Sequence, residues 1–395
     1  MKIAIEAQRI FRKEKHGMDY VALETIREIQ KIDRQNEYFI LVSPGEDRCL
    51  QESDNMHIVQ IDYPSYPLWE QIGLPSTLKK IQPDLLHCTG NTAPLWCHTP
   101  LILTLHDIIF LEPKQGKNQS VYQKLGRCYR RFVVPRILNK CRKIITVSNF
   151  EREHICKFLH WEPKKITTVY NGYSSHFRPI TEYQAVTQKY IGTKHYFFFL
   201  GNTDPKKNTA RILQAYRHYL NTSSQPLPLL IADLKEEVIN NYLRTYGLTD
   251  IKSMLYYPGY IPNKDLPALY SGATAFIYTS LRESFGIPIL EAMACGTPVI
   301  TSQTSAMPEI AGKDAISVNP YNPEEIVQAM VRLEEDPEYH HSLSQYGLRR
   351  VQQFSWKKTA LKTLELYNEI RLSAKDRSPL QPMHSVDKVH AANCP

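Results

Sequence analysis

The chain has 395 residues, 42% of them hydrophobic and 22% charged, which is typical of a globular protein with room for two domains of ordinary size. Its net charge of +8 is mild, and its eight cysteines include no C-x-x-C pair, so neither a disulfide framework nor a zinc site is indicated. The scattered cysteines favour reduced thiols, so we expect a cytoplasmic protein. There is also no apolar run of membrane-spanning length and no signal-peptide pattern.

The first part of the chain alternates apolar, strand-like runs with helical periodicity. We expect a helix over 18–29 and strands over 2–7, 38–42, 58–61, 85–88, 101–105, 144–149 (with a turn) and 166–170. Gly17 stands just before the helix, where a backbone without a side chain can approach a ligand closely. Strands alternating with helices predict parallel sheets with helices on both faces.

The strand over 101–105 ends at His106 and Asp107. Ligands of open parallel sheets bind beyond the carboxyl ends of the strands, so His106 stands at a position typical of function. Judged by position alone, a strand end whose backbone groups are capped by His and Asp is an equally good interpretation.

Residues 114–143 are the most polarised segment, with ten Lys or Arg residues and no acidic residue. An apolar stripe on a helix would consist of Tyr129, Phe132, Val133, Ile137 and Leu138. Such a helix could lie on an anionic membrane surface, while the ordinary alternative is a solvated face whose apolar side packs on its own domain. No recognised nucleic-acid module accompanies the stretch, so we expect no nucleic acid partner.

The second part of the chain continues the alternation. We expect strands over 196–201 and 227–232, loops over 202–208 and 257–262, and helices over 209–219, 264–271, 323–335 and 356–372. Lys207 stands at a strand–loop–helix junction, where a cation suits a diphosphate beside a helix end. The polar residues 374–395 have the composition of a disordered tail.

Residues 283–300 predict a loop, a short helix and a buried strand. Gly286 supplies the turn, Pro288 suits the first helical position, and Gly296 is placed as a C-terminal cap. The N–H groups at the helix start would bind phosphate. Two glutamates would flank this phosphate, Glu283 in the loop and Glu291 one turn inside the helix. Their carboxylates would accept hydrogen bonds from sugar hydroxyls. The ordinary alternative is that both are solvated surface charges, as most glutamates are. The arrangement suits a sugar nucleotide.

The string Tyr278–Ile300, with its two glutamates seven residues apart, resembles the donor-site signature of the retaining, GT-B-fold glycosyltransferases of family 4 (group 1). This large family includes sucrose-phosphate synthase and bacterial mannosyltransferases. The strings Thr104-Leu105-His106-Asp107, Val169-Tyr170-Asn171-Gly172 and Lys207-Asn208 also resemble family elements. The resemblance covers about residues 1–372 and implies an α/β fold of two doubly wound, Rossmann-like parallel-sheet domains facing a cleft.

The resemblance also implies how the chain is divided. The ranges are an acceptor-side domain over 1–175, a linker over 176–193, a nucleotide-sugar-binding domain over 194–355, a helix over 356–373 that crosses back to the first domain, and a tail over 374–395.

By the same resemblance, His106 and Glu283 are the catalytic residues. The donor-binding residues are Gly17, Asn202, Lys206, Lys207, Ile261, Phe285, Gly286, Ile287 and Glu291. Lys207 matches the lysine of the pair that neutralises the leaving diphosphate in the family. The arginine of that pair is absent, since Asn202 stands in its region, and Lys206 can substitute. A glycine expected after Ala232 is replaced by Asp233.

The implied function is transfer of a sugar, with mannose suggested by the resemblance, from a nucleotide-diphosphate donor to a hydroxyl of a glycan or lipid-linked acceptor in surface polysaccharide assembly. The configuration at the sugar would be retained. Because no D-x-D metal element is evident, we expect no metal or cofactor, with the nucleotide sugar as co-substrate. The protein would work in the cytoplasm, or at the inner face of the cytoplasmic membrane if 114–143 binds lipid. Two alternatives stay open: a non-catalytic GT-B subunit that binds nucleotide or glycan, and a nucleotide-sugar epimerase of similar build.

Overall fold

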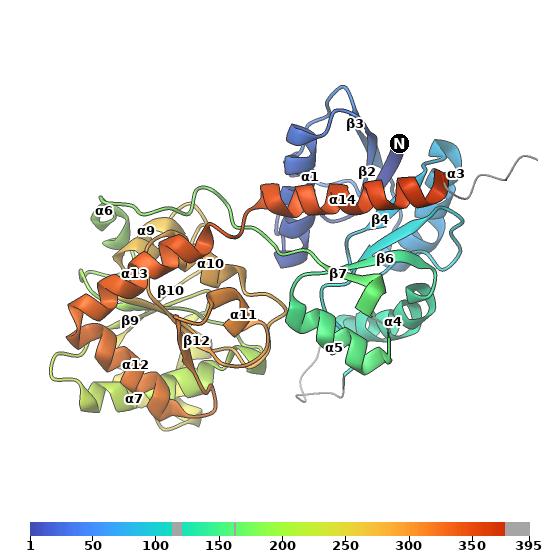
Figure 1. Cartoon of the computed structure of the whole chain (residues 1–395). Coiled ribbons are helices and arrows are strands. Elements are labelled where there is room, and N and C mark those ends of the chain that lie inside the picture. The colour runs from blue at the N-terminus through green and yellow to red at the C-terminus, as the bar shows by residue number, and fades with distance from the viewer. Residues whose placement is uncertain (113–120, 162, 376–395) are drawn as a thin grey trace, which may run out of the picture.

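The computed structural model describes residues 1–112, 121–161 and 163–375. Its strands form two sheets in which all neighbouring strands are parallel, and helices cover both faces (Figure 1). The first sheet has the order β3-β2-β1-β4-β5-β6-β7 and comprises β1 (Lys2–Glu6), β2 (Glu37–Val42), β3 (Met56–Gln60), β4 (Leu85–Cys88), β5 (Leu101–Thr104), β6 (Cys141–Thr146) and β7 (Ile166–Thr168). The second has the order β10-β9-β8-β11-β12-β13 and comprises β8 (Phe197–Leu200), β9 (Leu229–Ala232), β10 (Leu255–Gly259), β11 (Ala275–Tyr278), β12 (Val299–Ser302) and β13 (Ile316–Val318). The predicted fold class is confirmed.

Side chains of the first sheet alternate between two cores, because successive residues of a strand point to opposite faces. Ile3 and Ile5 of β1 lie in the core beneath α1 (Gly17–Ile32) and α14 (Trp356–Lys375). The remaining helices of this domain are α2 (Tyr66–Leu68), α3 (Leu74–Ile81), α4 (Val121–Leu138) and α5 (Asn149–Leu159), with a π-helical turn at Trp69–Gly73 and a 3-10 turn at Pro163–Lys165. Ala4 lies in the opposite core, with α3, α4 and α5.

The second sheet repeats this arrangement. The helices of this domain are α6 (Gln184–Thr187), α7 (Thr209–Thr222), α8 (Glu236–Thr245), α9 (Leu266–Gly272), α10 (Ile287–Ala294), α11 (Met307–Ala311), α12 (Pro323–Glu335) and α13 (Pro337–Val351), with 3-10 turns at Pro205–Lys207 and Thr249–Met254. Phe197 and Phe199 of β8 pack in the core with α7, α8 and α12, while Phe198 packs in the core with α9, α10 and α11.

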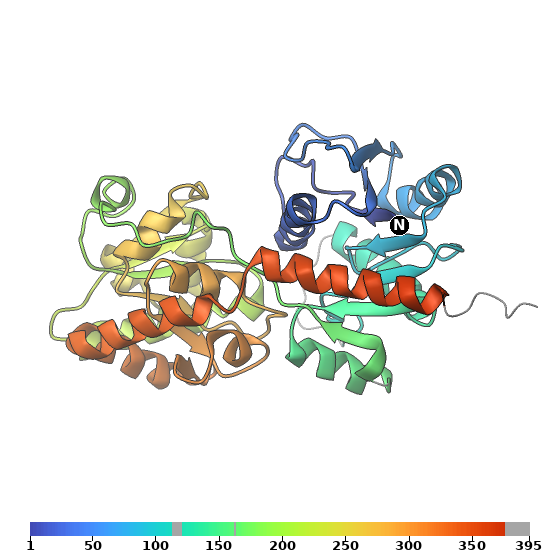
Figure 2. The same ribbon diagram turned by 45° about the horizontal axis from the view of Figure 1, so that its top comes forward.

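The last helix, α14, leaves the second domain and lies along the first. Figure 2 shows this helix beside the first sheet, with the two domains next to each other. The two sheets fall inside the ranges predicted for two domains, and the domain boundaries themselves stay predictions. Most of the predicted tail, from residue 376 onward, lies outside the described residues.

Several local predictions need correction. Strand β10 extends to Gly259, so the first half of the predicted loop over 257–262 belongs to the strand. Helix α10 begins at Ile287, which places Pro288 at its second position. Strands β11 and β13 and helices α8 and α13 were not predicted as elements.

The apolar stripe predicted for the basic segment is also wrong as a free surface. Residues 113–120 lie outside the described residues, and α4 begins at Val121. Val133, Ile137 and Leu138 are buried in the core of the first domain. The helix thus packs its apolar side on its own domain, and among the side chains described from residue 124 onward its exposed large apolar ones are Leu125 (65% exposed) and Phe132 (53%).

Candidate functional site

The candidate site lies where the order of the second sheet reverses direction. From the adjacent strands β8 and β11, the chain moves outward to β9 on one side and to β12 on the other. Loops that follow two such strands leave a crevice at the carboxyl edge of a parallel sheet, which is where ligands bind. Lys207 stands in the loop after β8, and Glu283 stands in the loop after β11. The topology therefore brings these two predicted residues together.

Lys207 and Glu283 form an ion pair, with 2.7 Å between Lys207 Nζ and Glu283 Oε1. The same ammonium group lies 3.3 Å from the Tyr278 hydroxyl. A backbone hydrogen bond from the Leu281 N–H to the Lys206 carbonyl oxygen, at 2.6 Å, ties the two loops to each other. The sequence predicts a phosphate contact for Lys207 and a sugar contact for Glu283, but it does not predict that the two side chains pair.

Asn208 fixes the spacing of the two loops and was missed in the sequence. Its side-chain amide donates to the Thr279 carbonyl at 3.0 Å and to the Pro320 carbonyl at 2.8 Å. Its φ of +64° is in the left-handed region, which asparagine tolerates better than most residues. Asn208 directly follows the 3-10 turn Pro205–Lys207, and an asparagine after a helical turn is a signal for this conformation, although it does not reveal the partners.

Helix α10 begins at the end of the Glu283 loop. Gly286 has a φ of +101°, and an added Cβ would lie 3.1 Å from Ile289 Cδ1, so glycine is favoured here. Pro288 has no N–H and the Ile289 N–H bonds to the Gly286 carbonyl, which leaves Ile287 as the first-turn donor available to an anion. Phe285 is buried against the Tyr170 and Phe354 rings, so only its backbone could contact a donor.

Glu291 lies one turn inside α10 and is half-buried. Burial raises the pKa of its carboxyl to about 7, and the nearby Tyr270 hydroxyl opposes this shift. A carboxylate whose charge is this poorly solvated gains from hydrogen bonds donated by a ligand, because such bonds stabilise the charged form. Sugar hydroxyl groups are donors of this kind.

The other residues of this domain that are predicted to contact the donor lie in contact with other parts of the protein. Asn202 Oδ1 accepts a hydrogen bond from the Asp204 N–H at 2.8 Å, and Lys206 Nζ lies 3.8 Å from Asp204 Oδ2. Ile261 is buried just beyond β10. Asp233 has a φ of +65°, which explains why glycine is the residue expected at this position by the resemblance. The donor contacts predicted for Asn202, Lys206 and Ile261 stay predictions.

On the first domain, His106 follows β5 and is buried. Its Nε2 lies 2.9 Å from the Thr89 carbonyl oxygen, and its backbone N–H donates to Asn91 Oδ1 at 2.6 Å. Because a carbonyl can only accept, Nε2 carries the proton, and Nδ1 is the acceptor in the neutral ring. Burial lowers the pKa of His106, which favours that neutral form. An Nδ1 lone pair can accept a hydrogen bond from a sugar hydroxyl.

A contact between domains brings the His106 and Glu283 loops together. Ser284 Oγ lies 3.4 Å from Asp107 Oδ2, so the residue after Glu283 meets the residue after His106. Gly17 is the first residue of α1, and an added Cβ would meet no atom within 4 Å, so its backbone is open to approach. The roles predicted for His106, Glu283 and Gly17 stay predictions.

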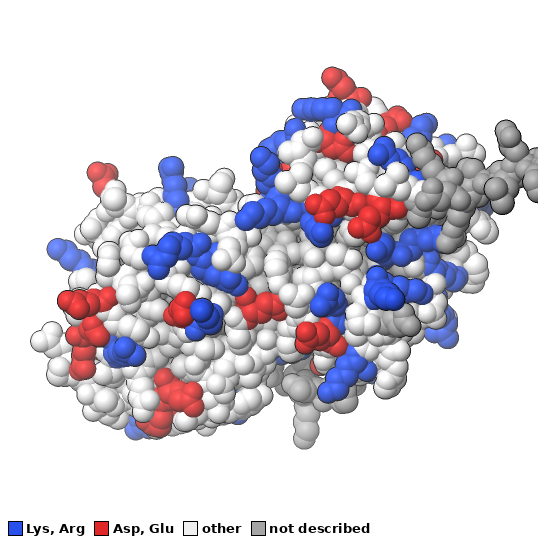
Figure 3. Space-filling view, viewed as in Figure 1, with Lys and Arg blue, Asp and Glu red and all other residues white. Residues whose placement is uncertain are grey.

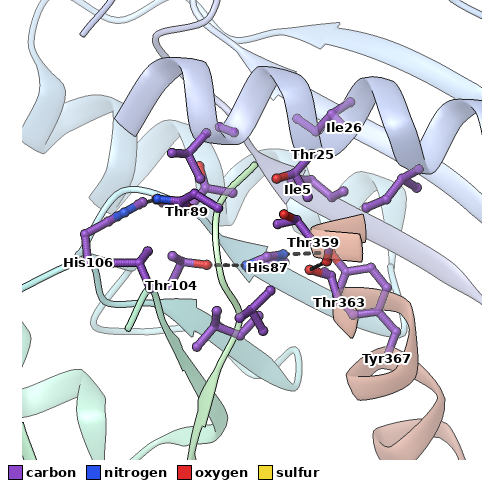
Figure 4. A pocket seen from close by; sticks show the side chains of 17 residues that line it. Ile5, Thr25, Ile26, His87, Thr89, Thr104, His106, Thr359, Thr363 and Tyr367 are labelled. Carbon is purple, nitrogen blue, oxygen red and sulfur yellow. Dashed lines mark hydrogen bonds between the residues drawn. The ribbon is translucent and has the colours of Figure 1, made fainter. Parts of the chain in front are cut away.

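A mostly apolar cavity lies beside His106, between α1, α14 and the first sheet (Figure 4). His87 lines this cavity. Its Nε2 lies 2.8 Å from Thr104 Oγ1, and its Nδ1 lies 2.6 Å from the hydroxyl of Tyr367 in α14. Burial lowers the pKa of His87 to about 3, so its ring is neutral. These contacts attach α14 to the first sheet, and the apolar lining does not suit a phosphate.

The described residues contain no group of three or more His, Cys, Asp or Glu side chains placed to hold a metal ion. Within the same ranges of the chain, no helix has the length and apolar character needed to cross a membrane.

Comparison with known families gives two matches that divide the chain. Residues 16–176 match the model described as Glycosyltransferase Family 4, and residues 184–350 match the model described as Glycosyl transferases group 1.

Individual relatives of the chain are also glycosyltransferases. The chain is 30% identical over 272 residues to the O-antigen chain mannosyltransferase B of Escherichia coli, covering 67% of this chain and 69% of that protein. It is 28% identical over 218 residues to the serotype-specific mannosyltransferase WbdA of Escherichia coli, covering 52% of this chain but only 26% of that longer protein.

The solved structure of sucrose-phosphate synthase from Thermosynechococcus elongatus superposes with a TM-score of 0.72 at 18% identity, covering 94% of this chain and 100% of that one. This match confirms the predicted GT-B fold.

Proposed function

The chain belongs to the group 1 glycosyltransferases of family 4, and from that premise we propose that it transfers mannose from a nucleoside-diphosphate donor to a hydroxyl of a glycan or lipid-linked acceptor. The observation that carries the proposal is the Lys207–Glu283 pair at the edge of the second sheet, beside the start of α10. A cation and a helix start together suit a diphosphate, while Glu283 and Glu291 suit sugar hydroxyls. The relatives named as mannosyltransferases support mannose as the sugar.

In the proposed reaction the bond between the sugar C1 and the phosphate oxygen breaks, and a bond from C1 to the acceptor oxygen forms on the same face. The acceptor proton passes to the leaving phosphate, so the configuration is retained without a protein nucleophile. Lys207 and the α10 start would stabilise the charge that develops on the leaving diphosphate. Glu283 already accepts a hydrogen bond from the Lys207 ammonium group, and it would stabilise the oxocarbenium-like sugar rather than attack it.

The experiment that tests this function is incubation of the protein with a panel of nucleotide sugars, followed by detection of slow donor hydrolysis. Release of nucleoside diphosphate, greatest with GDP-mannose, is the expected result. An altered sugar on an intact nucleotide would instead identify an epimerase. Binding without release would favour a non-catalytic subunit.

We expect activity to persist in excess EDTA, because fixed protein charge takes the place of a metal in the proposed site. Lys207 and the α10 start supply this charge. The measurement is transfer rate after removal of divalent ions, with a metal-dependent glycosyltransferase treated in parallel to verify chelation. Complete loss that magnesium or manganese restores would contradict the metal-independent site.

A second expectation concerns membrane contact by α4, whose exposed face carries Leu125 and Phe132 among Lys124, Arg131 and Arg136. On the face drawn in Figure 3, basic and acidic side chains are intermingled, with acidic ones over α14, so overall charge alone would not direct the protein to lipid. Each basic residue near anionic lipid contributes on the order of 1 kcal/mol. Because α4 exposes these basic residues beside Leu125 and Phe132, we expect the protein to bind anionic vesicles, and we expect added salt to weaken this binding.

Vesicle co-sedimentation measures this binding. Changing Lys124, Arg131 and Arg136 to Gln should lower it by about 100-fold. The matched control changes three exposed lysines of the second domain, Lys235, Lys264 and Lys313, to Gln. Equal losses in both variants, or equal binding to neutral vesicles, would remove the membrane contact from the proposed function.

A further inference from the structure

Helix α5 of the first domain begins against the second domain, where a carboxylate holds its first turn. Glu309 in α11 accepts hydrogen bonds from the backbone N–H groups of Asn149 at 2.8 Å and Phe150 at 2.9 Å. These N–H groups have no partner inside their own helix, and the helix dipole favours a negative charge beside them. The Tyr170 hydroxyl also donates to Glu309 Oε1, at 2.6 Å. One domain thus satisfies the helix end of the other.

A second contact joins the domains through Arg282, the residue directly before Glu283. Arg282 Nη1 pairs with Oε1 of Glu151, a residue of α5 whose side chain is fully buried. The guanidinium carbon lies 4.8 Å from the centroid of the Phe150 ring. Arg282 Nη2 also lies 3.6 Å from Glu112 Oε1. Because loss of Arg282 would leave the buried Glu151 carboxylate without its cation, the Arg282–Glu151 pair strongly constrains where its two chain segments lie.

The same guanidinium also holds the backbone of Glu283. Arg282 Nη1 lies 3.1 Å from Ser305 Oγ and 3.3 Å from the Glu283 carbonyl oxygen. Ser305 Oγ in turn contacts the Glu283 N–H at 3.0 Å and the Glu283 carbonyl at 2.5 Å. On the other side, the Ser148 hydroxyl donates to the Ser284 carbonyl at 2.8 Å. Both neighbours of Glu283 are therefore attached to the start of α5.

We propose that Arg282 and Glu151 are positioning residues for the transfer reaction, and that their contact across the domain interface sets the place of Glu283. The proposal rests on the proposed function, because it assigns Glu283 to the reacting sugar. Arg282 itself points to Glu151 and Phe150, whereas the Glu283 side chain points to Lys207. The donor site is then complete only while the two domains are in contact.

This arrangement separates chemistry from nucleotide binding. Lys207, Glu291 and the start of α10 all belong to the second domain, whereas the Arg282–Glu151 pair spans the domain interface. Loss of the Arg282–Glu151 pair should therefore lower kcat and leave nucleotide affinity unchanged. A merely structural role in folding would lower affinity and thermal stability together.

The test uses Arg282→Gln, Glu151→Gln and the double variant of the full chain. We expect kcat to fall by about 10- to 100-fold in each, because small misplacements of a reacting group have effects of this size. The dissociation constant for the nucleoside diphosphate should stay within about twofold, and the double variant should be no worse than the singles. Glu153→Gln is the matched control, an exposed glutamate of the same helix.

Amide hydrogen exchange of peptides covering 148–152 and 281–285 gives a readout that does not need activity. Exchange should rise in the Arg282 and Glu151 variants and not in the Glu153 control, with Arg282→Lys intermediate. Multiplicative losses in the double variant, unchanged kcat in both singles, or parallel loss of nucleotide binding would each overturn the proposal. If the native protein transfers no sugar, the proposed function fails. Equal exchange in all variants would then refute the interdomain contact separately.

Discussion

Glu283→Ala is expected to lower kcat by about 100- to 1000-fold, the loss typical of a group that stabilises charge in the transition state. Nucleotide affinity should be unchanged or tighter. In the native protein the Lys207 ammonium is paired with Glu283 at 2.7 Å, so removal of the carboxylate leaves the full lysine charge for the diphosphate. An interaction made only in the transition state has this signature in kcat.

Single-turnover transfer and direct titration with nucleoside diphosphate measure the two quantities independently. Glu283→Gln is the matched variant, because it keeps the shape of the side chain and removes its charge. A Glu283→Ala variant that loses nucleotide affinity along with kcat would contradict the assignment, since it would mean that Glu283 holds the nucleotide or the fold of the loop.

The fold could be predicted well from the sequence, because apolar runs and helical spacing are strong patterns that recur along the chain. Apolar runs such as residues 101–105 and 196–201 fall on buried strands, and their alternation with helices requires parallel sheets. Boundaries were less accurate where a local residue competes with the pattern. Pro228 precedes β9, which begins two residues later than expected, at Leu229.

The candidate site was only partly predictable. Lys207, Glu283 and Glu291 lie in recognisable strings, so the resemblance identifies them one by one. The Lys207–Glu283 pair joins residues 76 positions apart, and the Arg282–Glu151 pair joins residues 131 positions apart. No local signal reports such contacts, because they follow from strand order and domain contact. For the same reason Val133, Ile137 and Leu138 of α4 looked available to a membrane, although the domain core covers them.

Glu291→Gln is expected to weaken binding of the nucleotide sugar by about 10- to 100-fold, because hydrogen bonds to a charged group are worth about 1.5–3 kcal/mol. The proposed partners are the ribose hydroxyls, so kcat at saturating donor should fall much less than in the Glu283 variants. Calorimetric titration with the intact donor measures the affinity. Glu291→Asp should show an intermediate loss, because it keeps the charge and shortens the side chain. Unchanged affinity in Glu291→Gln would refute the ribose assignment.

The pH dependence gives Glu291 a second, independent signature. Burial raises the pKa of its carboxyl to about 7, and the ribose hydroxyls would bind the ionised form. Donor affinity of the native protein should therefore fall as pH drops below about 7, by at most tenfold per pH unit, and Glu291→Gln should remove this dependence. The probe is the intact nucleotide sugar, since the terminal phosphate of a free nucleoside diphosphate itself titrates near pH 6.

The effect of Glu291 ionisation on the stability of the fold should be opposite to its effect on donor affinity. A folded pKa above the unfolded value means that ionised Glu291 costs stability, so Glu291→Gln should raise Tm at pH 8 and lose that advantage toward pH 5. A variant that binds donor more weakly yet melts at a higher temperature would identify Glu291 as a residue kept for binding at the expense of stability, and a lower Tm at pH 8 would contradict that role.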